Sequence, residues 1–325
     1  MSDNEKIQAK FHFPDFTRHL RLNLFMLKMM QNVPEYFREG VTFASVYGAF
    51  PPAVWNGGRP MGGMICDEDY VRNVLHAFNS QGVPIRYTFT NPMIRKEHLD
   101  DEFCNMLMRL GDNGLNEVIV FSEVLEDYIR KTYPNYKITS STCKRLTDPE
   151  KIRDELNKDY HVVVLDYDMN NQFDVLDSLP HHEKIEMLIN STCIPKCPRR
   201  THEYEVCGEQ QIIYNEHLKR FPNTPFRMRD YKDYSMADFG NCPAMHRTPF
   251  DIRTLPHHIS PELIWDWYIP HGIRQFKISG RGSSKLAVIE LYMYYLIKPE
   301  CRDEARFMLL HNLDLNGVVK IDSGI

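Results

Sequence analysis

Four of the eight cysteines lie close together in the sequence, and thiols grouped in this way can bind a metal or take part in catalysis. In an intracellular chain, grouped thiols serve these roles more often than they form disulfides. The C-x3-C step from Cys193 to Cys197 is wider than the C-x2-C pairs of zinc ribbons, and it suits the separate iron atoms of a cuboidal cluster. We expect a 4Fe-4S iron–sulfur cluster, with zinc or no metal as alternatives, on Cys193, Cys197, Cys207 and Cys242.

The remaining cysteines are scattered along the chain, and we expect them to be buried or inert thiols: Cys66, Cys104, Cys143 and Cys301. Basic residues stand between the grouped cysteines. These residues are Lys196, Arg199 and Arg200. They can offset thiolate charge, bind an anionic substrate, or simply face solvent in a loop.

Two carboxylates precede the cysteine segment. Asp166 and Asp168 lie on one face of an expected strand over 161–169, because alternate strand residues point the same way. They suit a general acid–base pair or a clamp for basic side chains. We interpret Asp166 as a clamp and keep Asp168 as a candidate for substrate binding and catalysis.

Other expected strands also turn polar towards their C-terminal ends. In a parallel barrel these ends meet at one mouth, where enzymes of this architecture place their active sites. Single polar residues there can simply cap the following helix, but two or three on several strands indicate a polar, ligand-sized mouth. The candidates for binding are Asn91, Ser141 and Asn190, and Asn91 is also a catalytic candidate.

Strand-like segments alternate with helical ones, which is typical of parallel βαβ units. Seven strands can be identified, and we expect an eighth within 236–258, near Met236–Phe239 or Phe250–Arg253. The pattern favours a TIM-barrel-like (β/α)8 fold over an open doubly wound sheet, because no GxGxxG follows the first identified strand. The seven strands are 41–50, 85–91, 117–122, 136–142, 161–169, 184–192 and 273–280.

The barrel is expected to form one domain over 41–325, preceded by a helical extension over 1–40 with its helix at 17–38. The long segment 193–258 after the sixth identified strand is expected to be an insertion that covers the active site or holds the cluster.

The formal net charge is −5, from 39 basic and 44 acidic residues, which argues against nucleic-acid binding through bulk charge. With no apolar run long enough to span a membrane and no secretory signal, we expect a cytoplasmic protein.

Several segments together resemble the peptidase U32 family. They are VYGAF with the downstream NGGR, YTFTNP, SSTCK, the cysteine segment and FKISGR, in which Ser279 stands where the family has Glu. The resemblance implies a barrel-like fold and, as in several members, a four-cysteine iron–sulfur site, although the cysteine spacing here differs. Members include supposed collagenases, RNA hydroxylation proteins and partners in oxygen-independent ubiquinone hydroxylation. By position, Arg59 and Asn91 then line the mouth, and Arg281 follows the last strand.

The segment after Arg281 begins a helix with Gly and Ser, so it can hold an anion or simply make a tight turn. No HExxH or GxSxG motif supports a peptidase. We expect an iron–sulfur redox enzyme that hydroxylates or otherwise modifies a small aromatic or nucleobase substrate. An electron donor would supply its electrons. The alternatives are a zinc-stabilised hydrolase or lyase and a non-catalytic partner of a related U32-like subunit. Basic and aromatic residues over 219–232 also suit single-stranded RNA, or an ordinary solvated loop.

Overall fold

Parallel strands close into a barrel in the computed structural model, which describes residues 8–58, 63, 65–227, 230–231 and 242–320. Each strand pairs with the next in sequence, and β1 pairs with β8 to complete the ring. The predicted (β/α)8 architecture is confirmed. The strands are β1 (Ala9–Pro14), β2 (Val41–Gly48), β3 (Ile85–Phe89), β4 (Glu117–Val120), β5 (Lys137–Ser140), β6 (Val162–Val164), β7 (Ile185–Leu188) and β8 (Gln275–Lys277).

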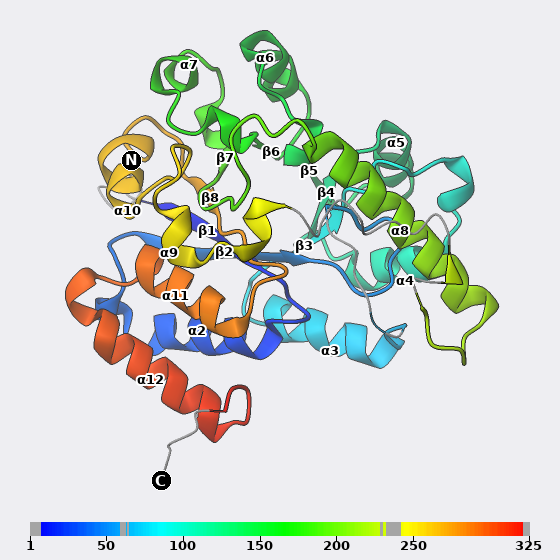
Figure 1. The fold of residues 1–325 in the computed structure, drawn as a ribbon, viewed down its shortest axis with the longest axis horizontal. Helices are drawn as coiled ribbons and strands as arrows, with labels where there is room; N and C mark the ends of the chain where they lie inside the picture. Colours follow the sequence, from blue (N-terminus) through cyan, green and yellow to red (C-terminus); the bar gives the residue numbers. More distant parts are fainter. Residues whose placement is uncertain (1–7, 59–62, 64, 228–229, 232–241, 321–325) are drawn as a thin grey trace.

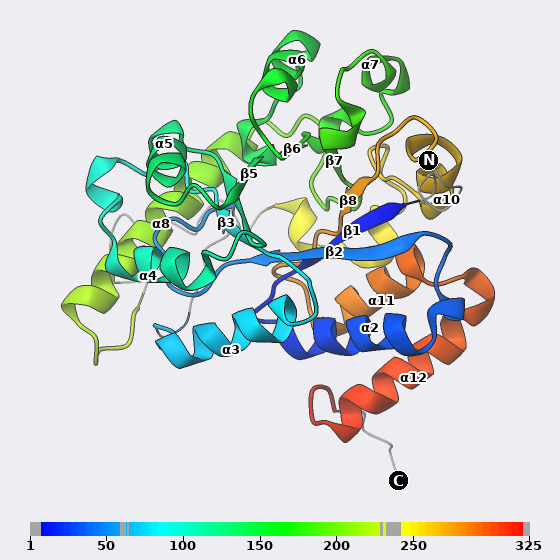
Figure 2. The same ribbon diagram turned by 180° about the vertical axis from the view of Figure 1, so that it is seen from behind.

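Helices surround the barrel, as the ribbon shows from both sides (Figures 1 and 2). Many begin at a side-chain cap that accepts a hydrogen bond from the first turn, such as Asp67 before α3 and Ser122 before α5. The helices are α2 (Leu20–Asn32), α3 (Glu68–Asn79), α4 (Glu102–Gly111), α5 (Glu123–Thr132), α6 (Pro149–Asn157), α7 (Phe173–Asp177), α8 (Arg200–Arg220), α9 (Pro249–Ile252), α10 (Pro261–Leu263), α11 (Lys285–Leu296) and α12 (Arg302–Leu315).

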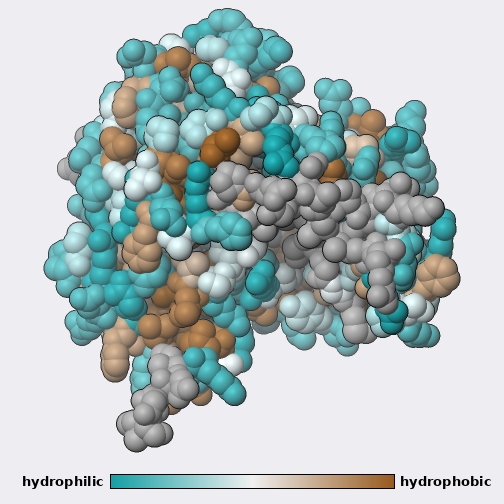
Figure 3. Space-filling model, in the orientation of Figure 1, coloured by the Kyte–Doolittle hydropathy of each residue, from teal (hydrophilic) through white to brown (hydrophobic). Residues whose placement is uncertain are grey.

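The apolar core lies between the strands and the helices. Phe13 of β1 stacks on Phe43 of β2 with ring centroids 3.7 Å apart, and it meets Tyr292 of α11 edge-on at 5.0 Å. The rings of Phe16 and Phe50 are also fully buried there. Aromatic area of this kind supplies a large share of the burial that holds the helices on the barrel. The helix shell leaves some apolar side chains exposed, including Leu286 and Phe307, and Figure 3 shows apolar surface over this part of the molecule.

The first strand lies in the segment for which only a helical extension was expected. β1 pairs with β2 and β8, so residues 9–14 are part of the barrel, and α2 belongs to its helical shell. The prediction of an eighth strand within 236–258 is wrong, because the ring closes without it. Phe250–Arg253 contains helix α9, and Met236–Phe239 lies outside the described residues. β1 has six residues, and its place in the barrel depends on pairing with β8 near the other end of the chain, which a local sequence pattern does not show.

The segment 193–258 follows β7, which is the sixth strand identified in the sequence. Its main described element is α8, a helix of 21 residues within the expected insertion. The buried residues of α8 include polar ones, among them Gln210, Gln211 and Asn215. An apolar stripe of helical period is therefore missing, although it is the usual sequence signal of a helix. Among the described residues, no helix is both long and apolar enough to span a membrane.

Candidate functional site

Helix α8 crosses the mouth of the barrel at the carboxyl ends of the strands. At its start, Arg200 pairs with Asp166 after β6 at 2.9 Å. Further along, Asn91 after β3 donates from Nδ2 to the carbonyl oxygen of Gly208 at 3.1 Å. Gln211 donates to the carbonyl oxygen of Pro52, in the loop after β2, at 3.2 Å. These contacts span the mouth from β6 to β2, and both ribbon views show α8 beside α4 and α5 (Figures 1 and 2).

Glycines allow the close approach of α8 and of the loop after β2. A Cβ added at Gly208 would collide with Asn91 Oδ1, and one added at Gly57 would collide with the Thr90 backbone. Gly58 has φ +73°, which other residues rarely adopt, and its Cβ position lies 3.0 Å from Arg281 Nη2. The glycines of NGGR therefore serve to close the mouth tightly around Arg281.

Charged side chains fill the barrel below the mouth, and we call this group the interior network. Arg86 of β3 lies at its centre, with Nη1 2.6 Å from Glu186 and Nε 3.1 Å from Glu117. Burial alone would raise the pKa of Glu186, but Arg86 and its neighbours lower it to about 2. His12 Nε2 lies 3.3 Å from Glu186, and burial lowers the pKa of His12 to about 3. Lys277 completes the network, with Nζ 3.8 Å from Glu186.

Lys277 connects the interior network to the mouth. Burial lowers its pKa to about 7, even though Glu186 favours the charged form. Its ammonium lies 4.2 Å from the ring centroid of Tyr47, a cation–π arrangement. Arg281 lies above it, donating to Thr88 Oγ1 at 2.7 Å and to the carbonyl oxygen of Gly57 at 2.9 Å. An amine that changes charge near neutral pH can donate or accept a proton at this mouth.

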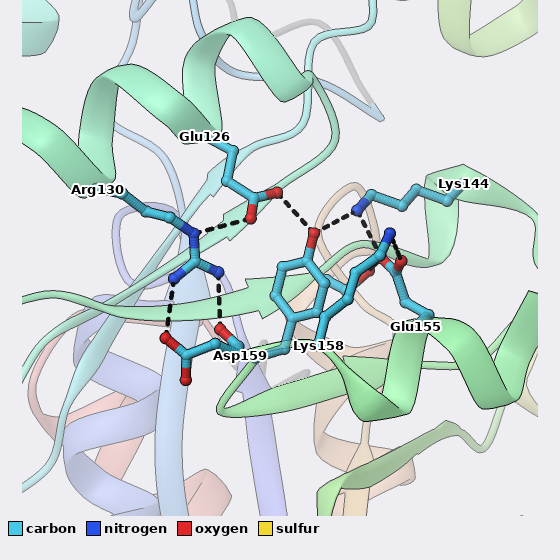
Figure 4. Close-up of polar contacts among 8 residues, drawn as sticks. Glu126, Arg130, Lys144, Glu155, Lys158 and Asp159 are labelled. Carbon is cyan, nitrogen blue, oxygen red and sulfur yellow. Dashed lines mark hydrogen bonds and ion pairs between the residues drawn. The ribbon is translucent and has the colours of Figure 1, made fainter.

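Cys143 is a buried thiol in the same part of the mouth. Burial raises its pKa, while a hydrogen bond with Ser141 and the charge of Arg281 act in the opposite direction. Its turn is anchored from outside by Lys144, which donates to Glu155 at 2.6 Å and to the Tyr160 hydroxyl at 2.9 Å. Figure 4 shows this network, which continues through Glu126, Arg130 and Asp159. As expected for a scattered cysteine, Cys143 is buried.

Cys193 and Cys197 come together in the loop after β7. Tyr167, Cys197 and Arg200 are the neighbouring groups that influence the pKa of the Cys193 thiol. Burial raises the pKa of Cys193, while Tyr167 and the nearby Arg200 act to lower it. A turn at Pro195 and Lys196 folds the chain back between the two thiols. Two of the four predicted ligands therefore lie on one short turn after β7.

Arg200 organises this region, and with Asp166, Asp168, Cys193 and Cys197 it forms what we call the mouth cluster. Arg200 Nη2 lies 2.9 Å from an oxygen of each aspartate. Asp168 also accepts from the Lys196 N–H at 2.9 Å, so it fixes the cysteine turn. Burial raises the pKa of Asp166, against the effect of Arg200. The clamp role proposed for Asp166 is thus seen in the geometry, and Asp168 takes part in the same clamp.

The mouth cluster contains buried donors without partners. Arg200 is 2% exposed, yet within the described residues its Nε and Nη1 have no hydrogen-bond partner. His257 lies beside the mouth cluster, with its ring 5.1 Å from that of Tyr167. Its Nε2 donates to the Ser191 carbonyl oxygen at 3.2 Å, so its buried Nδ1, which has no partner among the described residues, is an acceptor in the neutral ring. Buried donors without partners cost about 1–3 kcal/mol each, so a group that accepted hydrogen bonds from Arg200 would be stabilised here.

The other predicted mouth residues make structural contacts. Asn91 is fully hydrogen-bonded to Val54, Met93 and Gly208. Asn190 joins β7 to β8 by donating to the Ser279 carbonyl oxygen at 2.9 Å and accepting from the Ser279 N–H at 2.6 Å. Ser141 caps the turn that carries Cys143. Arg281 faces the mouth, and Arg59 lies outside the described residues.

The predicted metal set is not brought together. No group of three or more His, Cys, Asp or Glu side chains in the described part of the chain is placed to hold a metal ion. Cys207 is buried on α8, and Cys242 is half-buried before a short 3-10 helix (Pro243–His246). Four thiolates around one centre are the usual requirement for a 4Fe-4S cluster. The arrangement therefore does not fit an iron–sulfur cluster or a zinc ion on these four cysteines.

The basic segment proposed for RNA binding packs partly on itself. Phe226 and Tyr231 stack with ring centroids 5.3 Å apart, and both lie against His217 of α8. Lys219 pairs with Asp101, the cap of α4, at 2.6 Å. These aromatic rings are therefore occupied by protein contacts, while Arg229 and Lys232 lie outside the described residues.

Sequence reasoning missed the charged residues inside the barrel. Arg86, Glu186 and Lys277 stand in short buried strands, and in IEML the charged residue is surrounded by apolar ones. Charged residues in a buried parallel strand are unusual, because such strands normally read as apolar runs. The presence of charged residues in these strands was the sequence signal for this network. It would have indicated a charged barrel interior, although not which residues pair.

No protein-family model matches the chain, and no curated protein matches it. A search of solved structures finds a U32 peptidase. The TM-score is 0.44 and the sequence identity 13%, and the alignment covers 67% of this chain and 82% of that chain. The chain thus has a partial structural likeness to a U32 peptidase, as its sequence motifs predict.

Proposed function

We propose that the chain is an enzyme that carries out redox chemistry on a small substrate at the mouth of the barrel. The observation that carries the proposal is the position of Cys193 and Cys197 on one turn after the carboxyl end of β7, where Asp168 accepts from the Lys196 N–H and also pairs with Arg200. Thiols are redox-active groups, and barrel enzymes place their chemistry at this end of the strands.

The surroundings support a small polar substrate. Arg281, Lys277 and Cys143 approach the mouth from β8 and from the turn after β5, and α8 limits the space above them. Lys277, whose pKa is lowered to about 7 by burial, can hold or release a proton at its Nζ during turnover. Arg281 is held by Thr88 and Gly57, so its guanidinium is fixed for orienting a substrate.

A finer version of the proposal is oxygen-independent hydroxylation, or a related modification, of a small aromatic or nucleobase substrate with an iron–sulfur cluster. Its support is the sequence resemblance to the U32 family. The cysteines as placed do not assemble a four-ligand site, so we assign no step to a cluster. The redox element that we propose from the geometry is the thiol pair itself.

The test is a reductive titration of anaerobically purified protein, with iron and sulfide measured on the same sample. We expect the chain to take up electrons reversibly, and the Cys197→Ser variant to lose this uptake. Cys301→Ser is the matched control, because Cys301 lies far along the chain beside α12. About four iron per chain with broad absorption near 400 nm would favour the cluster version. A chain that takes up no electrons would rule out the redox proposal.

A further inference from the structure

We infer that Lys277 is a nucleophile that forms a protonated imine with small α-oxo acids, in which a carbonyl group adjoins a carboxylate. The inference goes beyond the proposed redox function, because it needs no thiol and no electron transfer. It also goes beyond proton transfer, because the amine itself becomes bonded to the carbonyl compound.

Lys277 stands at the border between the interior network and the mouth. It is the last residue of β8, and barrel enzymes place their chemistry at this end of the strands. Its side chain points into the barrel, where Nζ lies 3.8 Å from Glu186 Oε1. The side chain of Lys277 is 8% exposed, whereas those of Arg86 and Glu186 are completely buried. A small molecule in the mouth can therefore reach Lys277 before it reaches the rest of the network.

The contacts of the Lys277 ammonium leave its nitrogen able to react. The separation of 3.8 Å from Glu186 is longer than a hydrogen bond, and the ring centroid of Tyr47 lies 4.2 Å from Nζ. A carboxylate and the face of an aromatic ring both attract positive charge. Neither of them occupies the lone pair that appears on Nζ when the amine loses a proton.

Burial makes the neutral amine available at neutral pH. It lowers the pKa of Lys277 to about 7, together with the charges of Arg86 and Arg281 and against the effects of Glu186 and Cys143. An ordinary lysine, with a pKa near 10.4, is neutral in fewer than about one molecule in a thousand at pH 7. Desolvated lysines are the ones that add to carbonyl groups. The titratable and charged groups around Lys277 are His12 of β1, Tyr47 of β2, Arg86 of β3, Cys143 after β5, Glu186 of β7 and Arg281 after β8.

Arg281 favours a carbonyl compound that also carries a negative charge. Its Nη1 donates to Thr88 Oγ1 at 2.7 Å, and Thr88 Oγ1 lies 3.1 Å from the carbonyl oxygen of Gly48. Gly48 follows Tyr47, whose ring faces the Lys277 ammonium. Arg281 and Lys277 therefore meet at the same end of β2. A carboxylate next to the reacting carbonyl group is attracted by the guanidinium charge.

The reaction balances without an oxidant or a reductant. The lone pair of the neutral Lys277 Nζ forms a C–N bond to the carbonyl carbon, while the π electrons move to oxygen. One proton passes from nitrogen to this oxygen, which gives a carbinolamine. The hydroxyl group then leaves as water with one proton taken from solvent, and a protonated imine remains. Its charge equals that of the original ammonium, so Glu186 keeps a cation beside it.

The test is incubation of the full chain with glyoxylate and sodium cyanoborohydride near pH 7, followed by peptide mass analysis. Cyanoborohydride delivers hydride to a protonated imine and leaves a carboxymethyl group on the lysine that formed it. We expect this group to appear on Lys277 at least about a hundredfold faster than on the exposed Lys28 of α2, because an ordinary lysine is almost entirely charged at this pH. Labelling of Lys277 no faster than that of Lys28 would overturn the inference.

Two variants check the assignment to one amine. Lys277→Met should lose the fast labelling, and Lys28→Met, the matched control, should keep it. A further measurement needs no folded variant: in concentrated urea the unsubstituted chain should label Lys277 and Lys28 at similar rates, because the barrel no longer buries Lys277. A preference for Lys277 that persists in urea would contradict a reactivity created by the fold.

Glycolaldehyde tests the class of carbonyl compound, since it is similar in size to glyoxylate but carries no charge. The ratio of labelling at Lys277 to labelling at Lys28 should be smaller with glycolaldehyde than with glyoxylate. Equal ratios would overturn the choice of an oxo acid. None of these outcomes bears on the proposed redox function, which is tested separately by electron uptake.

Discussion

The interior network and the mouth cluster each place one arginine between two carboxylates, but the two arginines use different numbers of their guanidinium nitrogens. Arg86 uses all three nitrogens of its guanidinium, with Nε on Glu117, Nη1 on Glu186 and Nη2 donating to Thr139 at 3.0 Å. Arg200 uses Nη2 alone for both of its aspartates. The interior network also has buried atoms without a hydrogen-bond partner, but Arg86 Nε, His12 Nε2 and Glu186 Oε1 each lie within 3.8 Å of an ion-pair partner. In the mouth cluster, Nε and Nη1 of Arg200 have no hydrogen-bond partner among the described residues.

Breaking the interior network should have the largest effect on stability. Arg86→Met leaves Glu117 and Glu186 buried without their cation, and removal of one partner from a buried ion pair costs about 3–5 kcal/mol. We expect the free energy of unfolding, measured by denaturant titration, to fall by this amount. Arg130→Met is the control, because Arg130 pairs with Glu126 and the exposed Asp159 at the surface, where such pairs contribute at most about 1 kcal/mol. Equal losses in the two variants would contradict the comparison.

The mouth cluster should tolerate the same substitution better. In Arg200→Met, Asp166 can take up a proton, since burial already raises its pKa. We expect a loss of about 1–3 kcal/mol in the free energy of unfolding, smaller than for Arg86→Met. A loss as large as that of Arg86→Met would mean that the mouth cluster is as closed as the interior network. The measurement is again denaturant unfolding near neutral pH.

The interior network should also show itself in the pH dependence of stability. Burial holds the pKa of His12 at about 3, below its ordinary value of 6.5, so the folded chain binds fewer protons than the unfolded chain between these values. Stability should therefore fall with decreasing pH, and His12 should contribute about 1.4 kcal/mol per pH unit in that window. We expect His12→Gln to have a shallower slope by this amount. The exposed His76→Gln serves as the control, and identical slopes in all three proteins would contradict the assignment.

The sequence predicted the parts of the molecule that have a local pattern. Seven of the strands and most helices lie where the alternation of apolar segments places them, and Asp166, Asp168 and Cys193 do lie at the mouth. The elements that were not predicted depend on partners distant in sequence. β1 is defined by β2 and β8, and α8 packs through polar residues such as Gln211 and Asn215. The meeting of Arg200 with two aspartates about thirty residues earlier has no periodic signal at all.

The pairing of β1 with β8 has a consequence for how the protein is made. One edge of β1 has no partner until Gln275–Lys277 has left the ribosome, some 260 residues later. At roughly 5–20 residues per second, translation of that stretch takes on the order of 10–50 s. Open strand edges pair readily with other chains. The nascent polypeptide therefore exposes an unpaired strand edge during most of its synthesis. Chaperones that cover such edges should determine what fraction of the protein folds into the closed barrel.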